Sequence, residues 1–336
     1  MKKPNIKKMA ANLGKTLILP VAVYLLFFIL SRALGTGKFG LPSSTKIILQ
    51  QAMVSTCIAW AMSLNMMSGR WDFSMGAIVI LTSILAAPVA RALDIGGVGL
   101  LLASLVIAVC LASLNGVLYN LMRLPSLVLS IGLLLLYEFC MVVLFGGVGA
   151  KVSGKAMTIF GRSPYVFLLG LVMAVIFYLA YSHSLFGYEV RSLAYGQQIA
   201  VNIGVKEKKN ALLCYAFCGL FLGAAATINL SVSGGIESNP SFNNDMGIMF
   251  DAFPAVFIGM YLRKYTNFTF GLFIGALTMK LLTAGILTLS LPSSMQNIGT
   301  GLFLLLFIAF STNQTKIYEA RDRRRRGEEI LARQQQ

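Results

Sequence analysis

The residues of this chain that could do chemistry are ionisable side chains inside long apolar stretches. Glu138, Asp251 and Lys280 each interrupt a stretch that is otherwise apolar. A charged group at membrane depth is costly, and such groups commonly carry ions or protons or line the path of a polar solute. The alternative is that each makes only a polar contact between helices or at a helix end. The single histidine, His183, lies at the end of an apolar stretch, so the sequence gives little support for a proton relay.

The remaining reactive groups do not form a catalytic set. The sequence has no phosphate-binding Gly-Lys-Ser/Thr loop, no nucleophile elbow and no zinc-type spacing of histidine or cysteine. Cys214 and Cys218 share a helix face, but no histidine or carboxylate accompanies them, so we interpret them as small buried residues at a helix contact. We therefore expect a protein that is not an enzyme and that holds no metal or cofactor.

The apolar stretches have the length of membrane-spanning helices. Hydrophobic residues make up 57% of the chain and charged residues only 12%. Because roughly 20 apolar residues cross the hydrocarbon core, the pattern predicts an all-α polytopic membrane protein with about ten transmembrane helices. The predicted spans are 16–34, 46–67, 74–92, 97–121, 125–147, 164–182, 210–231, 247–262, 268–291 and 294–312.

These spans form one transmembrane domain, 16–312, between an N-terminal segment, 1–15, and a basic tail, 313–336. Most lysines and arginines fall on the side of this topology that holds both termini, including the consecutive Arg323–Arg326. Basic residues are retained on the cytoplasmic face, which predicts that both termini are cytoplasmic. We expect the first span to be a retained anchor, and the tail arginines to contact anionic membrane lipid rather than nucleic acid.

Glycine spacing predicts close packing between some of these helices. Gly219 and Gly223 are four residues apart, and so are Gly271 and Gly275. Small residues at this spacing let two helix backbones approach in a membrane, so packing is a better interpretation than contact with a solute.

The longest hydrophilic stretch between spans is 183–209. Its small residues and its apolar residues predict two short helices broken near Gly196. Such a pair could present one face of small and apolar side chains to a partner protein. It could equally be an ordinary amphipathic linker, and composition alone does not separate the two.

Several segments have the residue order of one transporter family. Residues 69–76 read Gly-Arg-Trp-Asp-Phe-Ser-Met-Gly, and residues 251–259 read Asp-Ala-Phe-Pro-Ala-Val-Phe-Ile-Gly. From about 38 to 313 the chain resembles the permease subunits of ATP-binding cassette (ABC) importers for ribose, xylose, galactose and autoinducer 2. The first segment is similar to Gly-Gly-Ile-Asp-Leu-Ser-Val-Gly, the most specific motif of that family, and the second to Asp-Ala-Ile-Ala-Ala-Val-Val-Ile-Gly.

The resemblance implies the ABC importer permease fold and a location in a bacterial inner membrane. It also implies the import of a small polar solute, a monosaccharide or related compound delivered by an extracytoplasmic binding protein. Two cytoplasmic ATPase subunits or domains would bind ATP and dock on 183–209, and a second permease would complete the pathway. The coupling-loop residues that it indicates are Gly187, Arg191, Ala194, Gly196, Ala200 and Gly204.

The candidate residues of the translocation path are Asn65, Asp72, Ser74, Gly76, Asn115, Ser130 and Asp251. For Asp72 the alternative is an N-terminal cap of the next helix, because a carboxylate there binds free backbone N–H groups. The alternative function is an ion-coupled secondary transporter, with its coupling ion on Glu138 or Asp251 and no partner ATPase.

Two segments depart from the family pattern. Met260–Asn267 contains no glycine where the family has a glycine-rich turn, and Gly196-Gln197-Gln198 stands where the family has Gly-Gly-Asn. These bulkier residues favour a pair of unlike permeases over a homodimer, although symmetric homo-oligomers are the commoner arrangement in general.

Overall fold

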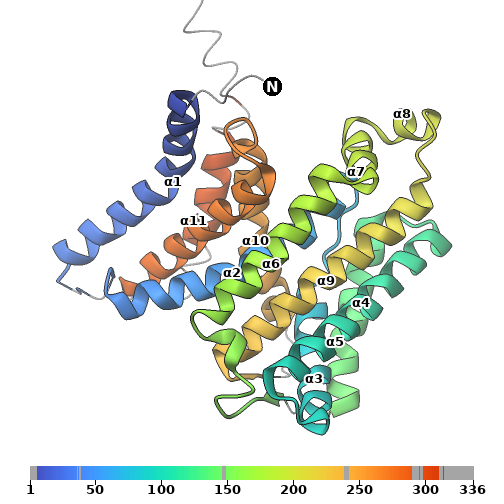
Figure 1. Cartoon of the computed structure of the whole chain (residues 1–336), viewed down its shortest axis with the longest axis horizontal. Coiled ribbons are helices and arrows are strands. Elements are labelled where there is room, and N and C mark those ends of the chain that lie inside the picture. The colour runs from blue at the N-terminus through green and yellow to red at the C-terminus, as the bar shows by residue number, and fades with distance from the viewer. Residues whose placement is uncertain are drawn as a thin grey trace, which may run out of the picture.

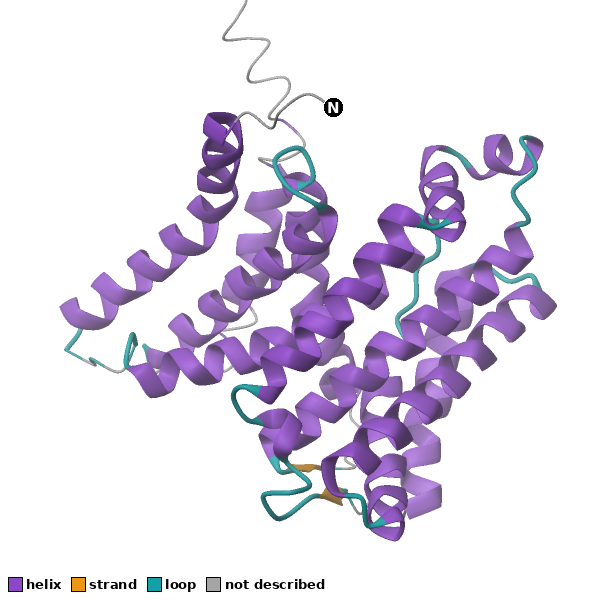
Figure 2. Ribbon diagram, in the orientation of Figure 1, coloured by secondary structure: helices purple, strands orange, loops and turns teal. Residues whose placement is uncertain are grey.

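The computed structural model describes residues 6–35, 37, 39–145, 149–237, 242–289, 295, 298–309 and 313. Most of them lie in helices, and the loops gather at two opposite ends (Figure 2). The helices are α1 (Ile6–Ala33), α2 (Pro42–Met67), α3 (Met75–Leu93), α4 (Gly96–Met122), α5 (Ser126–Phe145), α6 (Tyr165–Tyr178), α7 (Leu185–Tyr195), α8 (Gln197–Asn202), α9 (Glu207–Ser233), α10 (Phe242–Leu262) and α11 (Phe268–Thr288). The short elements are the 3-10 helix η1 (Ile159–Gly161), the π-helix η2 (Leu179–His183) and the strands β1 (Ala150–Lys151) and β2 (Gly235–Ile236).

The helices confirm the predicted all-α polytopic fold with about ten transmembrane helices. Within the described residues, 8 helices are long and apolar enough to cross a membrane. The other two predicted spans, 247–262 and 294–312, correspond to the shorter apolar helices Gly247–Leu262 and Ile298–Ala309. The predicted span ends at 147, 291, 294 and 312, and nearly all of the predicted tail 313–336, lie outside the described residues.

Helix α9 packs between α2 and α4 at the centre of the bundle (Figure 1). Its glycines face the backbone of α4: a Cβ at Gly219 would lie 2.5 Å from the Cα of Val109, and one at Gly223 would lie 2.7 Å from a backbone oxygen of Ser104. Gly275 of α11 meets α10 in the same way. The predicted use of the glycine pairs in packing is therefore confirmed, and dispersion contacts at this short range hold helices together where lipid removes the hydrophobic driving force.

Aromatic rings join four helices around the buried Phe177 of α6. The centroid of this ring lies 6.0 Å from that of Trp60 on α2, 5.6 Å from that of Phe221 on α9 and 6.2 Å from that of Phe268 on α11. Ring pairs at such distances stabilise a core beyond the area that they bury. Phe177 is thus a shared contact of α2, α6, α9 and α11.

The two ends of the bundle differ. One end holds α7, α8, the start of α1 and the loop between α10 and α11 (Figure 1). The opposite end holds β1 and β2, which pair antiparallel with Ala150 opposite Ile236 (Figure 2). This pairing links the segment that follows α5 to the segment that follows α9.

Candidate functional site

Helices α7 and α8 project from one end of the bundle between α6 and α9 (Figure 1). The hydroxyl of Ser184 accepts a hydrogen bond from the backbone N–H of Gly187 at 3.0 Å and so caps the start of α7. Gly196 separates the two helices with a φ of +151°, a conformation that favours glycine. The predicted pair of short helices broken near Gly196 is confirmed, and we call residues 185–204 the docking knob.

The residues predicted for the coupling loop occupy different positions in the docking knob. Gly187 and Ala200 are buried, and a Cβ at Gly187 would overlap the backbone oxygen of the preceding π-helix. Ala194 and Gly204 are exposed. Arg191 is half-buried and donates a hydrogen bond to the backbone oxygen of Tyr181, in the middle of η2, at 2.8 Å. The inward-facing members thus hold the docking knob against the bundle, and only the exposed members could touch a partner.

Large apolar side chains on the docking knob are exposed. The sequence interpretation included Ile199 and Ile203 in the predicted apolar face, but it did not single out Leu185 or Tyr195. Tyr195 is 85% exposed, Leu185 77%, Ile203 70% and Ile199 63%. The available signal was their recurrence in an otherwise hydrophilic segment. Exposed apolar side chains of this kind are typical of surfaces that contact a partner protein or a membrane. We call these four residues the knob surface.

The turn between α2 and α3 is tied to the docking knob through Arg70. This side chain is only 2% exposed, and its guanidinium donates to the hydroxyl of Ser68 at 3.0 Å, to the amide oxygen of Asn210 at 3.4 Å and to the backbone oxygen of Glu207 at 3.5 Å. Asn210 in turn donates to the carboxylate of Glu189 on α7 at 3.2 Å. The side chain of Glu207 also accepts a hydrogen bond from Gln197 of α8. Arg70 is therefore the centre of a network that reaches both helices of the docking knob.

Three of the predicted path residues meet at the start of α3. The carboxylate of Asp72 accepts hydrogen bonds from the backbone N–H of Ser74 at 2.9 Å and from its hydroxyl at 2.6 Å. Asn115 of α4 donates to the hydroxyl of Ser74 at 2.7 Å and accepts a hydrogen bond from Tyr137 of α5. Asp72 thus orders the residue just before α3, as in an Asx turn, and the chain of hydrogen bonds continues across α4 to α5.

The other predicted path residues lie elsewhere. Gly76 is buried in the first turn of α3, and Asn65 is fully buried near the end of α2. Ser130 donates to a backbone oxygen of its own helix, α5, at 3.0 Å. Asp251 of α10 forms an ion pair with Lys280 of α11, with 2.6 Å between carboxylate oxygen and ammonium nitrogen. The structure therefore separates Asp251 from the group around Asp72.

The two cysteines on α9 lie at a helix contact. The thiol of Cys218 donates to a backbone oxygen of α2 at 3.0 Å, and Cys214 is fully buried beside the turn between α2 and α3. Across the residues that the structure describes, no group of three or more histidines, cysteines, aspartates or glutamates is placed to hold a metal ion. Both thiols therefore contribute to helix packing.

A cavity of about 390 Å³, with both polar and apolar groups in its walls, lies between α2, α9, α10 and α11. The Asp251–Lys280 ion pair forms part of its wall. We call it the polar cavity, and its lining residues are Ile47, Gln50, Gln51, Val54, Ser55, Ile58, Asn229, Val232, Ser233, Ile248, Asp251 and Lys280.

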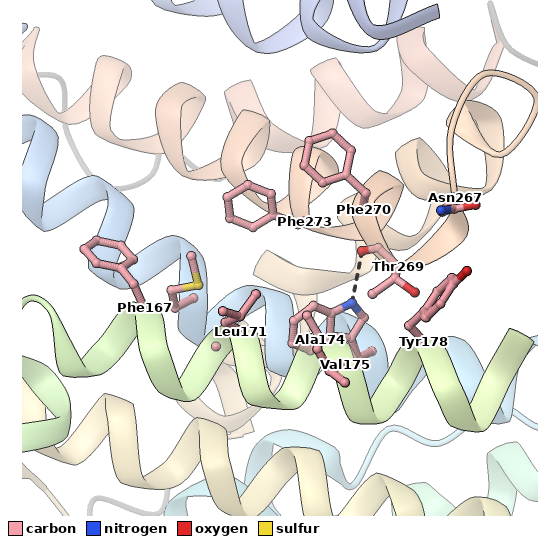
Figure 3. Close-up of a pocket in the computed structure, with 12 residues that line it drawn as sticks. Phe167, Leu171, Ala174, Val175, Tyr178, Asn267, Thr269, Phe270 and Phe273 are labelled. Carbon is pink, nitrogen blue, oxygen red and sulfur yellow. Dashed lines mark hydrogen bonds between the residues drawn. The ribbon is translucent and has the colours of Figure 1, made fainter. Parts of the chain in front are cut away.

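A second cavity, of about 410 Å³, lies between α2, α6 and α11 and has apolar walls (Figure 3). Phe167, Phe270 and Phe273 line it, and so does Trp60, whose indole donates to the backbone oxygen of Thr269 at 3.2 Å. Few groups here could form hydrogen bonds with a hydroxyl-rich solute. The apolar cavity therefore does not suit a polar solute, whereas the polar cavity does.

Known proteins match the chain over most of its length. The family model described as branched-chain amino acid transport system / permease component matches residues 44–310. The autoinducer 2 import system permease protein LsrC of Yersinia pseudotuberculosis serotype O:1b is 26% identical over 307 residues, which are 88% of this chain and 84% of that protein. The protein of the same name from Yersinia enterocolitica serotype O:8 / biotype 1B is 24% identical over 307 residues, 88% of this chain and 81% of that protein.

No solved structure matches the chain. The family match covers every described helix from α3 to α11 and nearly all of α2. With its membrane-spanning helices, this places the chain in the inner membrane as a multi-pass transport subunit of an ABC importer, not an enzyme. The chain belongs to the family of permease components typified by branched-chain amino acid transport systems.

Proposed function

We propose that this chain imports a neutral, hydroxyl-rich solute, a monosaccharide or a related compound, as one permease of an ATP-driven importer. The observation that carries the proposal is the family match over residues 44–310. Similarity to permeases named for autoinducer 2 import supports a sugar-like solute. The polar cavity, with its amide, hydroxyl and paired charged groups, is consistent with such a solute.

The docking knob would receive the ATPases. Its four exposed apolar side chains would be covered by the partner, and its buried glycine and alanine would keep the two short helices against the bundle. Closure of two ATPases around bound ATP would then favour one orientation of the helices over another, because the ATPases bind the two orientations with different affinity. An extracytoplasmic binding protein would deliver the solute at the opposite end, where β1 and β2 lie.

This arrangement requires the docking knob and both termini on the cytoplasmic side. Lys206, Arg263 and Lys264 lie in the connections at the knob end, and Lys208 lies in the first turn of α9. The described start of α1 lies at the same end (Figure 1). Their positive charge supports a cytoplasmic location for this end. The predicted N-terminal segment, 1–15, and the basic tail, 313–336, would then both be cytoplasmic.

A second, unlike permease would complete the pathway. The connection between α10 and α11 is short, and Lys264 within it packs on aromatic rings. The ammonium of Lys264 lies 3.9 Å from the ring centroid of Tyr261 and 5.0 Å from that of Tyr265. Such contacts stabilise one conformation of the connection. A fixed connection where the related permeases have a glycine-rich turn supports a partner of different sequence.

The test is uptake in cells that express the chain together with the genes that neighbour its own, among which we expect a permease, an ATPase and a binding protein. We expect uptake of radiolabelled ribose, xylose, galactose or autoinducer 2 that is lost when the phosphate-loop lysine of the ATPase is replaced. Uptake that survives this replacement but stops with a proton or sodium ionophore would instead establish a secondary transporter. Purification of the complex in mild detergent checks the assembly, since two copies of this chain without a second permease would refute the unlike pair.

A further inference from the structure

The Asp251–Lys280 ion pair stands in the wall of a cavity rather than in a packed helix contact. The ammonium of Lys280 donates to the carboxylate of Asp251 at 2.6 Å across the interface of α10 and α11. The side chain of Asp251 is nevertheless 41% exposed and that of Lys280 16% exposed. Because of this partial exposure, both charged groups are accessible from the cavity.

Both members of the pair have hydrogen-bonding capacity beyond the bond that joins them. An ammonium has three N–H donors and an ionised carboxylate accepts at two oxygens. Among the described residues, the one hydrogen bond of each side chain is the bond to the other. Spare donors of one group therefore stand beside spare acceptors of the other, on a wall that carries no net charge.

The rest of the cavity extends the same pattern. Gln51 and Ser55 line it from α2, and Asn229 and Ser233 line it from α9. Amides and hydroxyls both donate and accept hydrogen bonds. The volume of about 390 Å³ lies in the range of cavities that hold small molecules.

We propose that the polar cavity is a binding site within the membrane domain for a neutral polyol, with Asp251 accepting hydrogen bonds from its hydroxyl groups and Lys280 donating to them. A hydroxyl can do both, so a polyol binds without separating the pair. An anionic ligand would be repelled by the carboxylate and a cationic ligand by the ammonium, so a ligand without charge suits this wall best. This inference rests on the proposed function, because it names where the imported solute binds in this chain.

The position of the cavity fits a solute that enters from the end opposite the docking knob. Asn229 and Ser233 belong to the last two turns of α9, next to β2. The amide of Gln50 donates to the backbone oxygen of Gly161 in η1 at 2.8 Å, which ties this wall to the loops of the same end. A solute released by an external binding protein would reach this cavity before it reaches the turn at Asp72.

Protection of an introduced thiol tests the site. Ser233→Cys in a Cys110→Ser background, assembled with its partner subunits, places a thiol on the cavity wall and removes an exposed native cysteine. Because a pocket covers most of the surface of its ligand, we expect saturating D-ribose, D-xylose or D-galactose to slow labelling by a hydrophilic thiol reagent about tenfold. Leucine and citrate should not protect. The control is Leu171→Cys in the apolar cavity, which no sugar should protect.

A paired substitution gives a second measurement. Asp251→Asn with Lys280→Gln keeps hydrogen-bonding groups but removes both charges, so no unpaired charge is left in the membrane. Loss of charge-assisted hydrogen bonds should raise the KM for sugar uptake about tenfold or more. A purely structural pair would instead lower the amount of assembled protein and leave the KM of the remainder unchanged.

The outcomes separate this inference from the proposed function. ATP-driven sugar uptake with no sugar protection of the thiol at 233 overturns the cavity assignment and leaves the importer intact. Protection of this thiol by leucine or citrate, but by no sugar, refutes the proposal that the ligand is a polyol. Absence of any ATP-dependent uptake, with the ATPase missing from the purified complex, refutes the proposed function itself.

Discussion

Replacement of Arg70 should separate ATP hydrolysis from transport. Arg70→Met keeps most of the length and the apolar contacts of the side chain but removes every donor. The guanidinium at present joins the turn between α2 and α3 to Asn210 and Glu207 at the start of α9, and through them to the docking knob. Without it, movement of the docking knob no longer reaches the turn through hydrogen bonds.

The size of the effect follows from the three contacts. A hydrogen bond to a charged group contributes about 1.5–3 kcal/mol. Only the 3.0 Å contact with Ser68 has an ordinary length, whereas those at 3.4 and 3.5 Å are long. We therefore assign about 2–4 kcal/mol to the network as a whole. Because the substitution also removes a buried charge, the net change in the free energy of unfolding should be smaller, about 0–2 kcal/mol.

The assay is the ratio of solute transported to ATP hydrolysed, measured in liposomes with the ATPases and the binding protein. A coupling free energy of about 2 kcal/mol corresponds to about a 30-fold change, so we expect this ratio to fall by roughly one order of magnitude or more. Lys208→Met is the control, since it removes an exposed cation from the same end of the molecule. An unchanged ratio in Arg70→Met, with the protein assembled normally, would refute the role of the network.

Three further predictions concern the docking knob and the helix contacts. Ile199→Asp should release the ATPase during purification, because burial of an exposed apolar side chain by a partner contributes about 1.5–3 kcal/mol, whereas its exposed polar neighbour Gln198→Asp should retain it. Gly219→Ala should lower thermal stability by about 1–3 kcal/mol through overpacking against α4, and Gly132→Ala, with open space at its Cβ, should not. Tyr137→Phe removes the hydroxyl that donates to the amide oxygen of Asn115 on α4, and should lower the free energy of unfolding in detergent by about 1–3 kcal/mol. An unchanged melting temperature would count against the hydrogen-bond chain from Asp72 to Tyr137.

Local sequence patterns were enough to predict the helices and the break in the docking knob. The length of an apolar stretch predicts a span because a helix must reach across the bilayer. Gly196 predicts a break because glycine adopts backbone conformations with positive φ, and its φ in the structure is positive. The predicted spans at 247–262 and 294–312 correspond to apolar helices of only 10–17 described residues, shorter than the other spans. The first contains Pro254 and is the C-terminal part of a longer helix.

Contacts between distant residues could not be predicted in the same way. In the sequence, Arg70 looks like an ordinary basic residue of a cytoplasmic loop. It is buried in the structure, because two of its hydrogen-bond acceptors, Glu207 and Asn210, lie 137 and 140 positions further along the chain. The long side chain of Lys280 could reach either membrane surface, so the sequence does not indicate its partner. Only the packing of α10 on α11 shows that this partner is Asp251. The small residues of the docking knob likewise predict a close contact, but the sequence does not say whether a helix of the same chain or a partner supplies the other side.

The ring of Phe177 has a mechanical consequence for the helix that carries the docking knob. Because this ring packs against Trp60, Phe221 and Phe268 at once, α6 cannot slide along one neighbour without disturbing the other two. A tilt about the ring disturbs these contacts least. The start of α6 lies at the opposite end of the bundle from the docking knob. If the docking knob moved to one side, the start of α6 would then move to the opposite side.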